Sequence, residues 1–134
     1  MDWTLEVVPV PVTDVDRAKH FYSEQVGFSV DHDTKLSDEM RVVQLTPPGS
    51  GCSIVISVGL FDAAPGSIKG LQLVVSDVDA ARSGLAERGV DVSEIMHFDN
   101  GSYLPGRGGD WNSFIYFDDP DGNSWTIQER PASR

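Results

Sequence analysis

The chain has 134 residues, the size of one ordinary domain, and a formal net charge of −11. A surface this acidic is a poor partner for nucleic acid or an anionic membrane, whereas a neutral or cationic small molecule suits it. No apolar run approaches the roughly 18 residues of a membrane span, and no signal-peptide pattern is visible at the N-terminus. We therefore expect a cytoplasmic protein that binds neither nucleic acid nor membranes.

The first half of the chain predicts a strand, a helix and three further strands. Pro9 and Pro11 lie in the first strand and each removes a hydrogen-bond donor, so this strand should lie at a sheet edge or seam. Apolar residues at helical spacing from Ala18 to Val26 predict a helix with one buried face. The predicted elements are a strand at Glu6–Val12, a helix at Asp14–Gln25, and strands at Phe28–Asp33, at Glu39 or Met40 to Thr46, and at Cys52–Val58.

The second half repeats this order after a connector that is rich in small residues, Phe61–Ser67. The aperiodic segment His97–Asp110 is expected to be a long loop, and such loops in compact domains are usually functional or mobile. A hairpin turn is predicted at Asp118–Asn123, because Pro120 fixes φ and Gly122 can adopt positive φ. The other predicted elements are a strand at Leu71–Ser76, a helix at Val78–Arg88, and strands at Val90–Met96, Trp111–Phe117 and Ser124–Glu129.

One short phrase occurs twice, as VTDVDRA at residues 12–18 and as VSDVDAA at residues 75–81. Asp14 and Asp77 stand where the two helices begin, so their carboxylates should accept hydrogen bonds from the first turn. A repeat on this scale indicates one supersecondary unit used twice. We expect an α+β fold of two βαβββ modules in a single domain, at about residues 5–60 and 69–130, with outer helices and mixed curved sheets around a shared cavity.

These features together resemble the vicinal oxygen chelate superfamily, which includes glyoxalase I, the extradiol dioxygenases and the bleomycin-resistance proteins. The resemblance runs from about Glu6 to Glu129. It rests on the element order, the doubled phrase, the Phe21-Tyr22 pair followed by Gly27-Phe28, and the sequence DPDGN at residues 119–123 before the last strand. Such motifs indicate the fold and say little about the reaction, because function depends on the site.

The resemblance implies where a metal would be held. In metal-using members, four ligands, which are His, Glu or sometimes Gln, come from the first and last strands of each half. The corresponding positions here are Val7, Gly70, Thr126 and, within about one residue, Val55. Aliphatic side chains and glycine offer no ligand atom, and one threonine is a poor ligand. We therefore expect neither the usual metal site nor any other cofactor.

Strand parity indicates which side chains share the faces of those positions. Gln72 lies on the face of Gly70, Gln128 on the face of Thr126, and Pro9 on the face of Val7. Such a mostly apolar cavity with a few uncharged polar groups suits a small organic ligand. A closed core filled by the same side chains is the alternative. A displaced metal site made of Gln72, Gln128 and His97 also stays open.

The 97–110 segment and the residue after it supply further candidates. Tyr103 and Trp111 could stack on a planar ligand, whereas His97, Asp110 and Arg107 could act as acid, base or anion anchor. The alternative for His97 is a surface loop residue. Glu129 is expected to be a solvated strand end. The candidate catalytic residues are His97, Tyr103 and Asp110, and the predicted ligand-binding residues are Pro9, Gln72, Tyr103, Trp111, Thr126 and Gln128.

Three functions follow, in order of preference. The first is a metal-free binding protein similar to the bleomycin-resistance branch, which sequesters a drug or metabolite. The second is a metal-free isomerase, cyclase or lyase of specialised metabolism, and the third is a metal-dependent lyase or dioxygenase. Metal analysis separates the third from the others, and recovery of an unchanged ligand separates the first from the second. Open sheet edges tend to be covered, so we also expect a homodimer.

Overall fold

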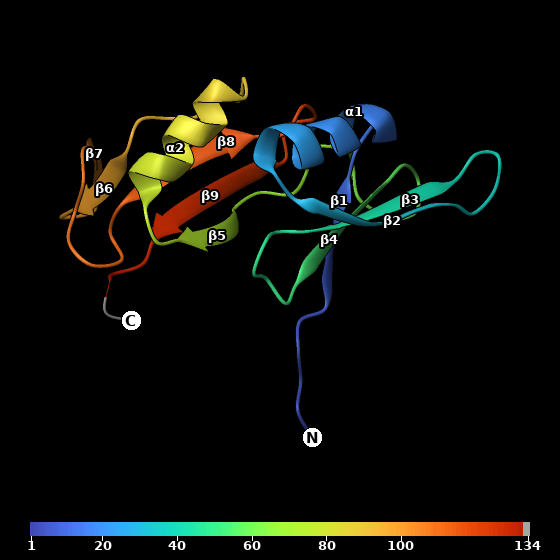
Figure 1. Cartoon of the computed structure of the whole chain (residues 1–134), viewed down its shortest axis with the longest axis horizontal. Helices are drawn as coiled ribbons and strands as arrows, with labels where there is room; N and C mark the ends of the chain where they lie inside the picture. The colour runs from blue at the N-terminus through green and yellow to red at the C-terminus, as the bar shows by residue number, and fades with distance from the viewer. Residues whose placement is uncertain (133–134) are drawn as a thin grey trace. The chain divides into compact units, whose positions relative to one another are not determined.

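The computed structural model describes residues 1–132, which form two compact units (Figure 1). Unit 1 contains residues 1–68 and 119–123, and unit 2 contains residues 69–118 and the chain from residue 124. Each unit is a mixed β-sheet with a helical segment, which confirms the α+β prediction and the doubled module. The predicted module boundaries and the cavity shared by the modules stay predictions.

Unit 1 has a four-stranded sheet in the order β1-β4-β3-β2. Strand β1 lies at the edge and runs parallel to β4, as its prolines predicted. The predicted single helix is divided, because residues after His20 adopt the wider π-helical register, which ends with Gly27 N–H bonded to the Tyr22 carbonyl. The elements are β1 Val7–Pro11, α1 Val15–His20, the π-helix η1 Phe21–Val26, β2 Ser29–Lys35, β3 Arg41–Thr46 and β4 Ser53–Ser57.

The helical segment of unit 1 buries the stripe that its sequence predicts. Ala18, Phe21 and Tyr22 are all buried, and they share the core with apolar residues from one face of the sheet. Alternation along the strands sends every second side chain into this core. The sheet contributes Val10, Val43, Leu45, Ile54 and Ile56 to it.

The turn at residues 119–123 belongs to unit 1, although the strands on either side of it belong to unit 2. The buried Asp119 carboxylate accepts hydrogen bonds from Tyr22 Oη at 2.7 Å and Asn123 Nδ2 at 2.8 Å. It also accepts the backbone N–H groups of Asp121 and Asn123. The predicted hairpin turn is therefore stabilised by the hydrogen bonds of Asp119 as well as by the backbone preferences of Pro120 and Gly122.

Unit 2 has a five-stranded sheet in the order β5-β9-β8-β6-β7. In Figure 1, α2 lies over β8 and β9, and the hairpin β6–β7 forms one end of the five-stranded sheet. The elements are β5 Leu71–Val75, α2 Val78–Glu87, β6 Met96–Asp99, β7 Ser102–Pro105, β8 Phe114–Asp118 and β9 Ser124–Glu129.

Two predictions about the middle of unit 2 are wrong. The predicted strand Val90–Met96 is mostly irregular, and strand β6 begins only at Met96. The predicted long loop His97–Asp110 contains the antiparallel hairpin β6–β7. Its turn is Asn100-Gly101, with φ values of 52° and 81°. Positive φ at both positions is typical of the two-residue turns that match strand twist, and Asn-Gly is their preferred sequence.

Both predicted helix caps are confirmed. Asp14 Oδ1 accepts the Arg17 backbone N–H at 3.0 Å, and Asp77 Oδ1 accepts the Ala80 backbone N–H at the same distance. Each bond satisfies a backbone donor that the first helical turn leaves unpaired. The repeated phrase therefore encodes two equivalent helix starts.

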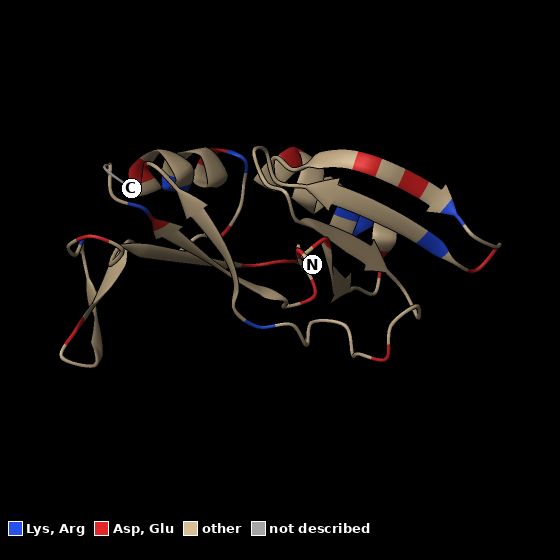
Figure 2. Ribbon diagram, turned by 90° about the horizontal axis from the view of Figure 1, so that it is seen from below, with Lys and Arg blue, Asp and Glu red and all other residues tan. Residues whose placement is uncertain are grey.

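Acidic residues are spread over helices, strands and loops of both units (Figure 2). Arg41 pairs with two of these acidic residues. Its guanidinium binds Asp33 through two bonds of 2.7 Å and also binds Asp16. The pKa of Asp33 is held well below its usual range by this bidentate bond and by the bond from Lys19. In residues 1–132, no helix is both long enough and apolar enough to cross a membrane.

Candidate functional site

The two faces of the unit 2 sheet differ in chemistry. One face packs against α2 and buries Ile115, Phe117, Trp125 and Ile127. Because successive side chains alternate, the residues between these four point to the other face, which we call the open face. From β5, β9 and β8, the open face carries Gln72, Val74, Thr126, Gln128, Phe114 and Tyr116.

Two predicted ligand-binding residues are connected across the open face by their amide groups. Gln72 Nε2 donates to Gln128 Oε1 at 2.7 Å, and Gln128 Nε2 donates to the Trp111 carbonyl at 2.8 Å. Thr126 lies opposite Gln72 in the strand register. Strand alternation therefore predicted correctly that these residues share a face, and the structure adds that the two amides are hydrogen-bonded to each other.

The hairpin β6–β7 adds an aromatic cluster to the open face. Tyr103 and Phe98 face each other across the hairpin, with ring centroids 3.7 Å apart. The Tyr103 ring also meets the edges of Phe114 at 6.5 Å and Tyr116 at 5.8 Å, both nearly perpendicular. Tyr103 is 46% exposed and Phe98 is 44% exposed, so the cluster presents aromatic surface to a ligand.

Burial raises the pKa of Tyr116 well above its usual value, and the neighbouring Tyr103 phenol raises it further. Tyr116 is therefore protonated at neutral pH, and its hydroxyl can donate a hydrogen bond but carries no charge. The open face combines aromatic rings, amides and hydroxyls, all of them neutral. Such a face can stack on and hydrogen-bond an organic molecule, and it offers no charged group for anion binding.

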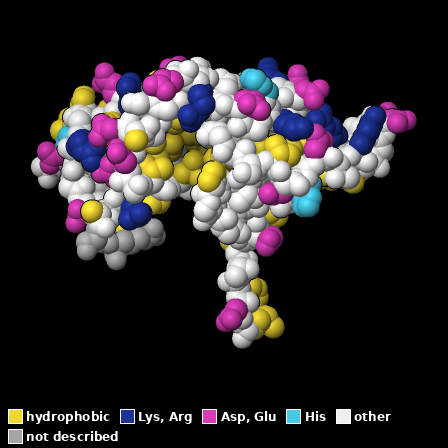
Figure 3. All heavy atoms as spheres, viewed as in Figure 1, with side chains coloured by type: hydrophobic (Ala, Val, Ile, Leu, Met, Phe, Trp, Pro, Cys, Tyr) yellow, Lys and Arg dark blue, Asp and Glu magenta, His cyan; other side chains and the backbone are white. Residues whose placement is uncertain are grey.

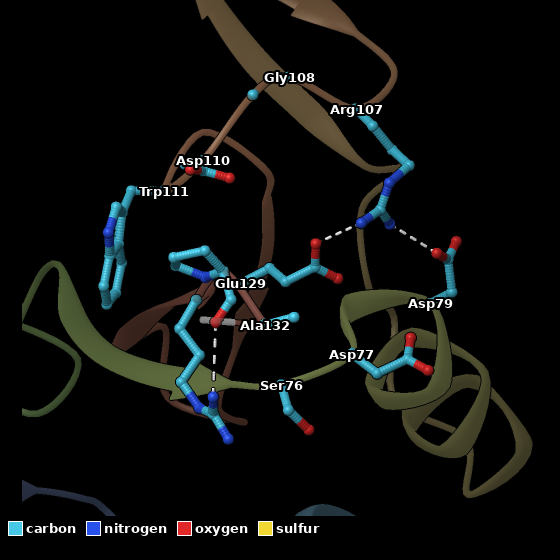
Figure 4. Close-up of a pocket in the computed structure, with 12 residues that line it drawn as sticks. Ser76, Asp77, Asp79, Arg107, Gly108, Asp110, Trp111, Glu129 and Ala132 are labelled. Atoms are coloured by element: carbon cyan, nitrogen blue, oxygen red, sulfur yellow. Dashed lines mark hydrogen bonds and ion pairs between the residues drawn. The ribbon is translucent and has the colours of Figure 1, made fainter. Parts of the chain in front are cut away.

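Two other predicted residues line a different feature, a polar pocket of about 510 Å³ in unit 2 (Figure 4). Asp110 and Trp111 form one side of it, and Arg107 binds both Asp79 and Glu129 on another. Glu129 also accepts the Val78 backbone N–H at 2.9 Å, at the start of α2. The prediction that Glu129 is a solvated strand end is thus wrong, because it holds a helix start and an arginine.

Trp111 lies between the two features. Its ring lines the polar pocket, whereas its carbonyl accepts the bond from Gln128 on the open face. Its φ is 61°, a left-handed conformation that bulky residues rarely adopt. The prediction that strand β8 begins at Trp111 is wrong, because this conformation delays the strand until Phe114.

His97 is separated from the aromatic cluster by strand geometry. Phe98 and Met96, its neighbours on β6, are in register with Tyr103 and Phe114 of the open face, so His97 points to the opposite side. Its Nδ1 lies 2.9 Å from the Gly106 carbonyl oxygen. His97 therefore does not share a face with Tyr103, and its catalytic role stays a prediction.

Pro9 belongs to unit 1, where it lies exposed on β1 opposite Val55 of β4. It shares its face of the sheet with Val7 and Pro11, as parity predicted. Its role in ligand binding, like that of the unit 2 residues, stays a prediction.

Four positions of this chain correspond to the metal ligands of the family that the sequence resembles, and we call them the inherited positions. The residues at these positions do not fit a metal. Val7 and Val55 are aliphatic, Gly70 has no side chain and lies just before β5, and Thr126 has one neutral hydroxyl. Divalent metals in proteins are held by nitrogen, thiolate or carboxylate ligands. Among residues 1–132, moreover, no three His, Cys, Asp or Glu side chains are grouped so that they could hold a metal ion.

Sequence reasoning missed three aromatic residues of the open face, namely Phe98, Phe114 and Tyr116. Two signals could have found them. The Asn-Gly turn predicts the hairpin that pairs Phe98 with Tyr103. The turn at Gly122 sets the register of β8 against β9, and that register places Tyr116 opposite Thr126 and Phe114 opposite Gln128.

The chain is similar to several solved structures over nearly its full length. It is 33% identical to TnmS3, an antibiotic binding protein from Streptomyces sp. CB03234, covering 96% of this chain and 97% of that one with a TM-score of 0.78. It is 34% identical to a glyoxalase/bleomycin resistance protein from the same organism, covering 93% and 99% with a TM-score of 0.74. A superfamily member from Sphaerobacter thermophilus DSM 20745 is 26% identical, covering 96% and 98% with a TM-score of 0.77.

Among curated proteins, no significant match was found. The family model of the Glyoxalase/Bleomycin resistance protein/Dioxygenase superfamily matches residues 2–127. Together with the doubled module and the structural similarity, this match covers almost the entire chain. The protein therefore belongs to the Glyoxalase/Bleomycin resistance protein/Dioxygenase superfamily.

Proposed function

We propose that the protein binds a small planar organic molecule, such as a drug or metabolite, and sequesters it without chemistry and without a metal. The observation that carries this proposal is the open face of unit 2, where exposed Tyr103 and Phe98 rings stand beside neutral amides and hydroxyls. Stacking on aromatic rings provides affinity, and the amides orient a ligand. TnmS3, 33% identical to this chain, is described as an antibiotic binding protein, which supports the same class of function.

The choice against a metal enzyme rests on ligand chemistry. The side chains at the four inherited positions cannot form a metal's inner shell. The displaced alternative would need His97 beside Gln72 and Gln128, but His97 points to the other side of the sheet and the two amides are bonded to each other. Metal analysis of the purified protein tests this part of the proposal, and a stoichiometric transition metal would contradict it.

A binding titration with a matched pair of variants tests the ligand site. The probe is aminomethyl-fluorenone, a planar aromatic ketone whose ammonium group suits a chain of net charge −11. Tyr103→Ala removes the exposed ring and should weaken binding by roughly fivefold or more, since stacked aromatic pairs contribute on the order of 1 kcal/mol beyond area burial. Leu104→Ala is the control, because Leu104 is 40% exposed on the same strand but points to the opposite face.

Equal losses in both variants, or no binding to the wild type, would contradict the proposed site. Recovery of the probe after prolonged incubation separates binding from turnover. Unchanged probe supports sequestration, whereas a product that disappears in Asp110→Ala would support the metal-free enzyme instead.

We also propose that the protein is a homodimer. Residues Met1 to Glu6 extend from β1 as an arm whose exposed hydrophobic side chains are visible in Figure 3. Apolar and polar residues alternate along it, so Trp3 and Leu5, which are 88% and 71% exposed, share one side. Such period-two alternation is typical of a strand with one buried face. Within residues 1–132, however, the pairing of β1 with β4 begins only at Val7, after the arm. A second copy would bury these side chains.

Light scattering after gel filtration tests the dimer. The wild type should have twice the 14.6 kDa mass of one chain, and Trp3→Asp should lower the mass toward that of the monomer. Thr4→Asp is the control, because it adds the same charge to the opposite side of the arm. A monomeric wild type, or a dimer that tolerates both variants equally, would contradict this role of the arm.

A further inference from the structure

Tyr116 has a buried hydroxyl group that forms no hydrogen bond. It lies on β8 and points to the open face, opposite Thr126 of β9. Among the described residues, no polar atom meets its hydroxyl oxygen in hydrogen-bonding geometry. Buried polar groups in folded proteins are nearly always paired, because an unpaired one forfeits its bonds to water. The unpaired hydroxyl of Tyr116 is therefore free to donate to a ligand.

The Tyr103 ring packs against the ring that carries this hydroxyl. The two rings meet edge to face, 5.8 Å apart at 87°, and Tyr103 itself is half exposed. The Tyr103 phenol is near enough to raise the pKa of Tyr116, yet the two hydroxyls do not meet with the distance and angle of a hydrogen bond. A ligand acceptor that enters beneath the Tyr103 ring would therefore compete only with this poorly aligned phenol for the Tyr116 hydroxyl.

The segment that carries Tyr103 is lightly attached to the rest of the sheet. Strand β6 bridges β8 at a single pair, Met96 with Phe114. Beyond this bridge, the Asn112 side chain takes the place of a strand neighbour, since it bonds the backbone N–H and carbonyl of Phe98 at 2.9 Å each. The outer half of the hairpin thus depends on one side-chain amide and on aromatic packing, so small movements of Tyr103 break no sheet ladder.

The surroundings define the kind of atom that the hydroxyl would bind. The Tyr116 ring packs against Tyr103, which in turn packs against Phe114, and the polar groups on the open face are neutral. A negatively charged acceptor would lose its hydration there and would be repelled by a chain of net charge −11. A neutral acceptor such as a carbonyl oxygen loses far less, and a planar conjugated ketone also presents faces for stacking.

We infer that Tyr116 is the specificity-determining residue of the ligand site: its hydroxyl donates to a carbonyl oxygen of a planar aromatic ketone that inserts beneath the Tyr103 ring. This inference rests on the proposed binding function and names its ligand class. The Tyr103 ring then stacks on the ligand, while Gln72 and Gln128 keep the bond that joins them.

Tyr116→Phe tests the inference with two probes that differ only in the carbonyl group. Aminomethyl-fluorenone has the acceptor, and aminomethyl-fluorene has the same ring system without it. In calorimetric titrations, the variant should bind the ketone roughly five- to tenfold more weakly, and its affinity for the hydrocarbon should be unchanged. The thermal unfolding midpoint should not fall, because no hydrogen bond of the free protein is lost.

The outcomes separate this inference from the function on which it rests. If the wild type binds neither probe, the proposed function fails and the inference fails with it. If the wild type binds both and Tyr116→Phe weakens neither, or weakens both equally, the ligand site stands and the role of Tyr116 is wrong. Tyr103→Ala provides the second measurement, since it should weaken both probes through lost stacking.

Discussion

Replacement of Tyr22 by phenylalanine should destabilise unit 1, because it removes one hydroxyl from a buried network. Tyr22 and Asn123 are 0% exposed and Asp119 is 4% exposed, so no water can replace the lost donor. The bond from Tyr22 Oη to the Asp119 carboxylate is 2.7 Å long. The same carboxylate keeps three other donors, which are Asn123 Nδ2 and the backbone N–H groups of Asp121 and Asn123.

The magnitude follows from these contacts. A hydrogen bond to a charged group contributes about 1.5–3 kcal/mol to stability. Because three other donors still bind the carboxylate, it is not left unpaired, and we expect the free energy of unfolding to fall by about 2 kcal/mol. Tyr22→Phe leaves the aromatic packing against Phe21 and Phe28 in place and creates no large cavity. For a domain of this size, each kcal/mol corresponds to roughly 3–5 °C in Tm, so the midpoint should fall by about 6–10 °C.

Differential scanning calorimetry and urea denaturation measure this change, and the denaturant slope should stay constant. The matched control is Tyr116→Phe, which removes the same atom from a hydroxyl that forms no hydrogen bond. The control should keep or raise the midpoint, since burying an unpaired hydroxyl costs free energy. The reasoning is refuted if Tyr22→Phe changes Tm by less than about 1 °C, or if both variants lose equal stability.

Two further predictions concern unit 1. The hydrogen bonds from Arg41 hold the pKa of Asp33 far below its usual range. The ionised carboxylate therefore stabilises the folded state above about pH 4, the pKa of an aspartate in the unfolded chain, and this stabilisation is lost as the pH falls toward the folded pKa. Asp33→Asn should therefore cost roughly 1 kcal/mol at pH 7, discounted for partial exposure, and should flatten the loss of stability below pH 4 in urea titrations; parallel curves would contradict this. Gly66→Ala should lower stability by about 2 kcal/mol or more, since φ is +78° and the added Cβ would lie 2.1 Å from the Asp121 carbonyl oxygen, whereas Gly51→Ala, which meets nothing within 4 Å, should have little effect on the calorimetric midpoint.

Local chemistry made much of the fold predictable. The helix starts at Asp14 and Asp77 depend on contacts within four residues, and the strand Ser124–Glu129 was predicted with the bounds that the structure has. The wrong predictions come from local signals that compete. Residues 97–110 have a glycine-rich composition that favours a loop, but the Asn100-Gly101 pair specifies a hairpin turn.

The candidate site was predictable only in part, for a physical reason. Alternation placed Gln72, Thr126 and Gln128 on one face, because side-chain direction along a strand is a local property. It could not show that the two amides bond each other, because this depends on the register between strands far apart in the sequence.

Composition, charge pattern and the repeated phrase determined by themselves the α+β class, the doubled module and both helix caps, since these follow from interactions between near neighbours in the chain. Only the tertiary structure decided that the Tyr103 ring packs edge to face against Tyr116, whose hydroxyl has no hydrogen-bond partner among the described residues, and that Arg107 joins Asp79 to Glu129. Such contacts join residues that are distant in sequence, and their geometry emerges only when the strands pair and the side chains pack.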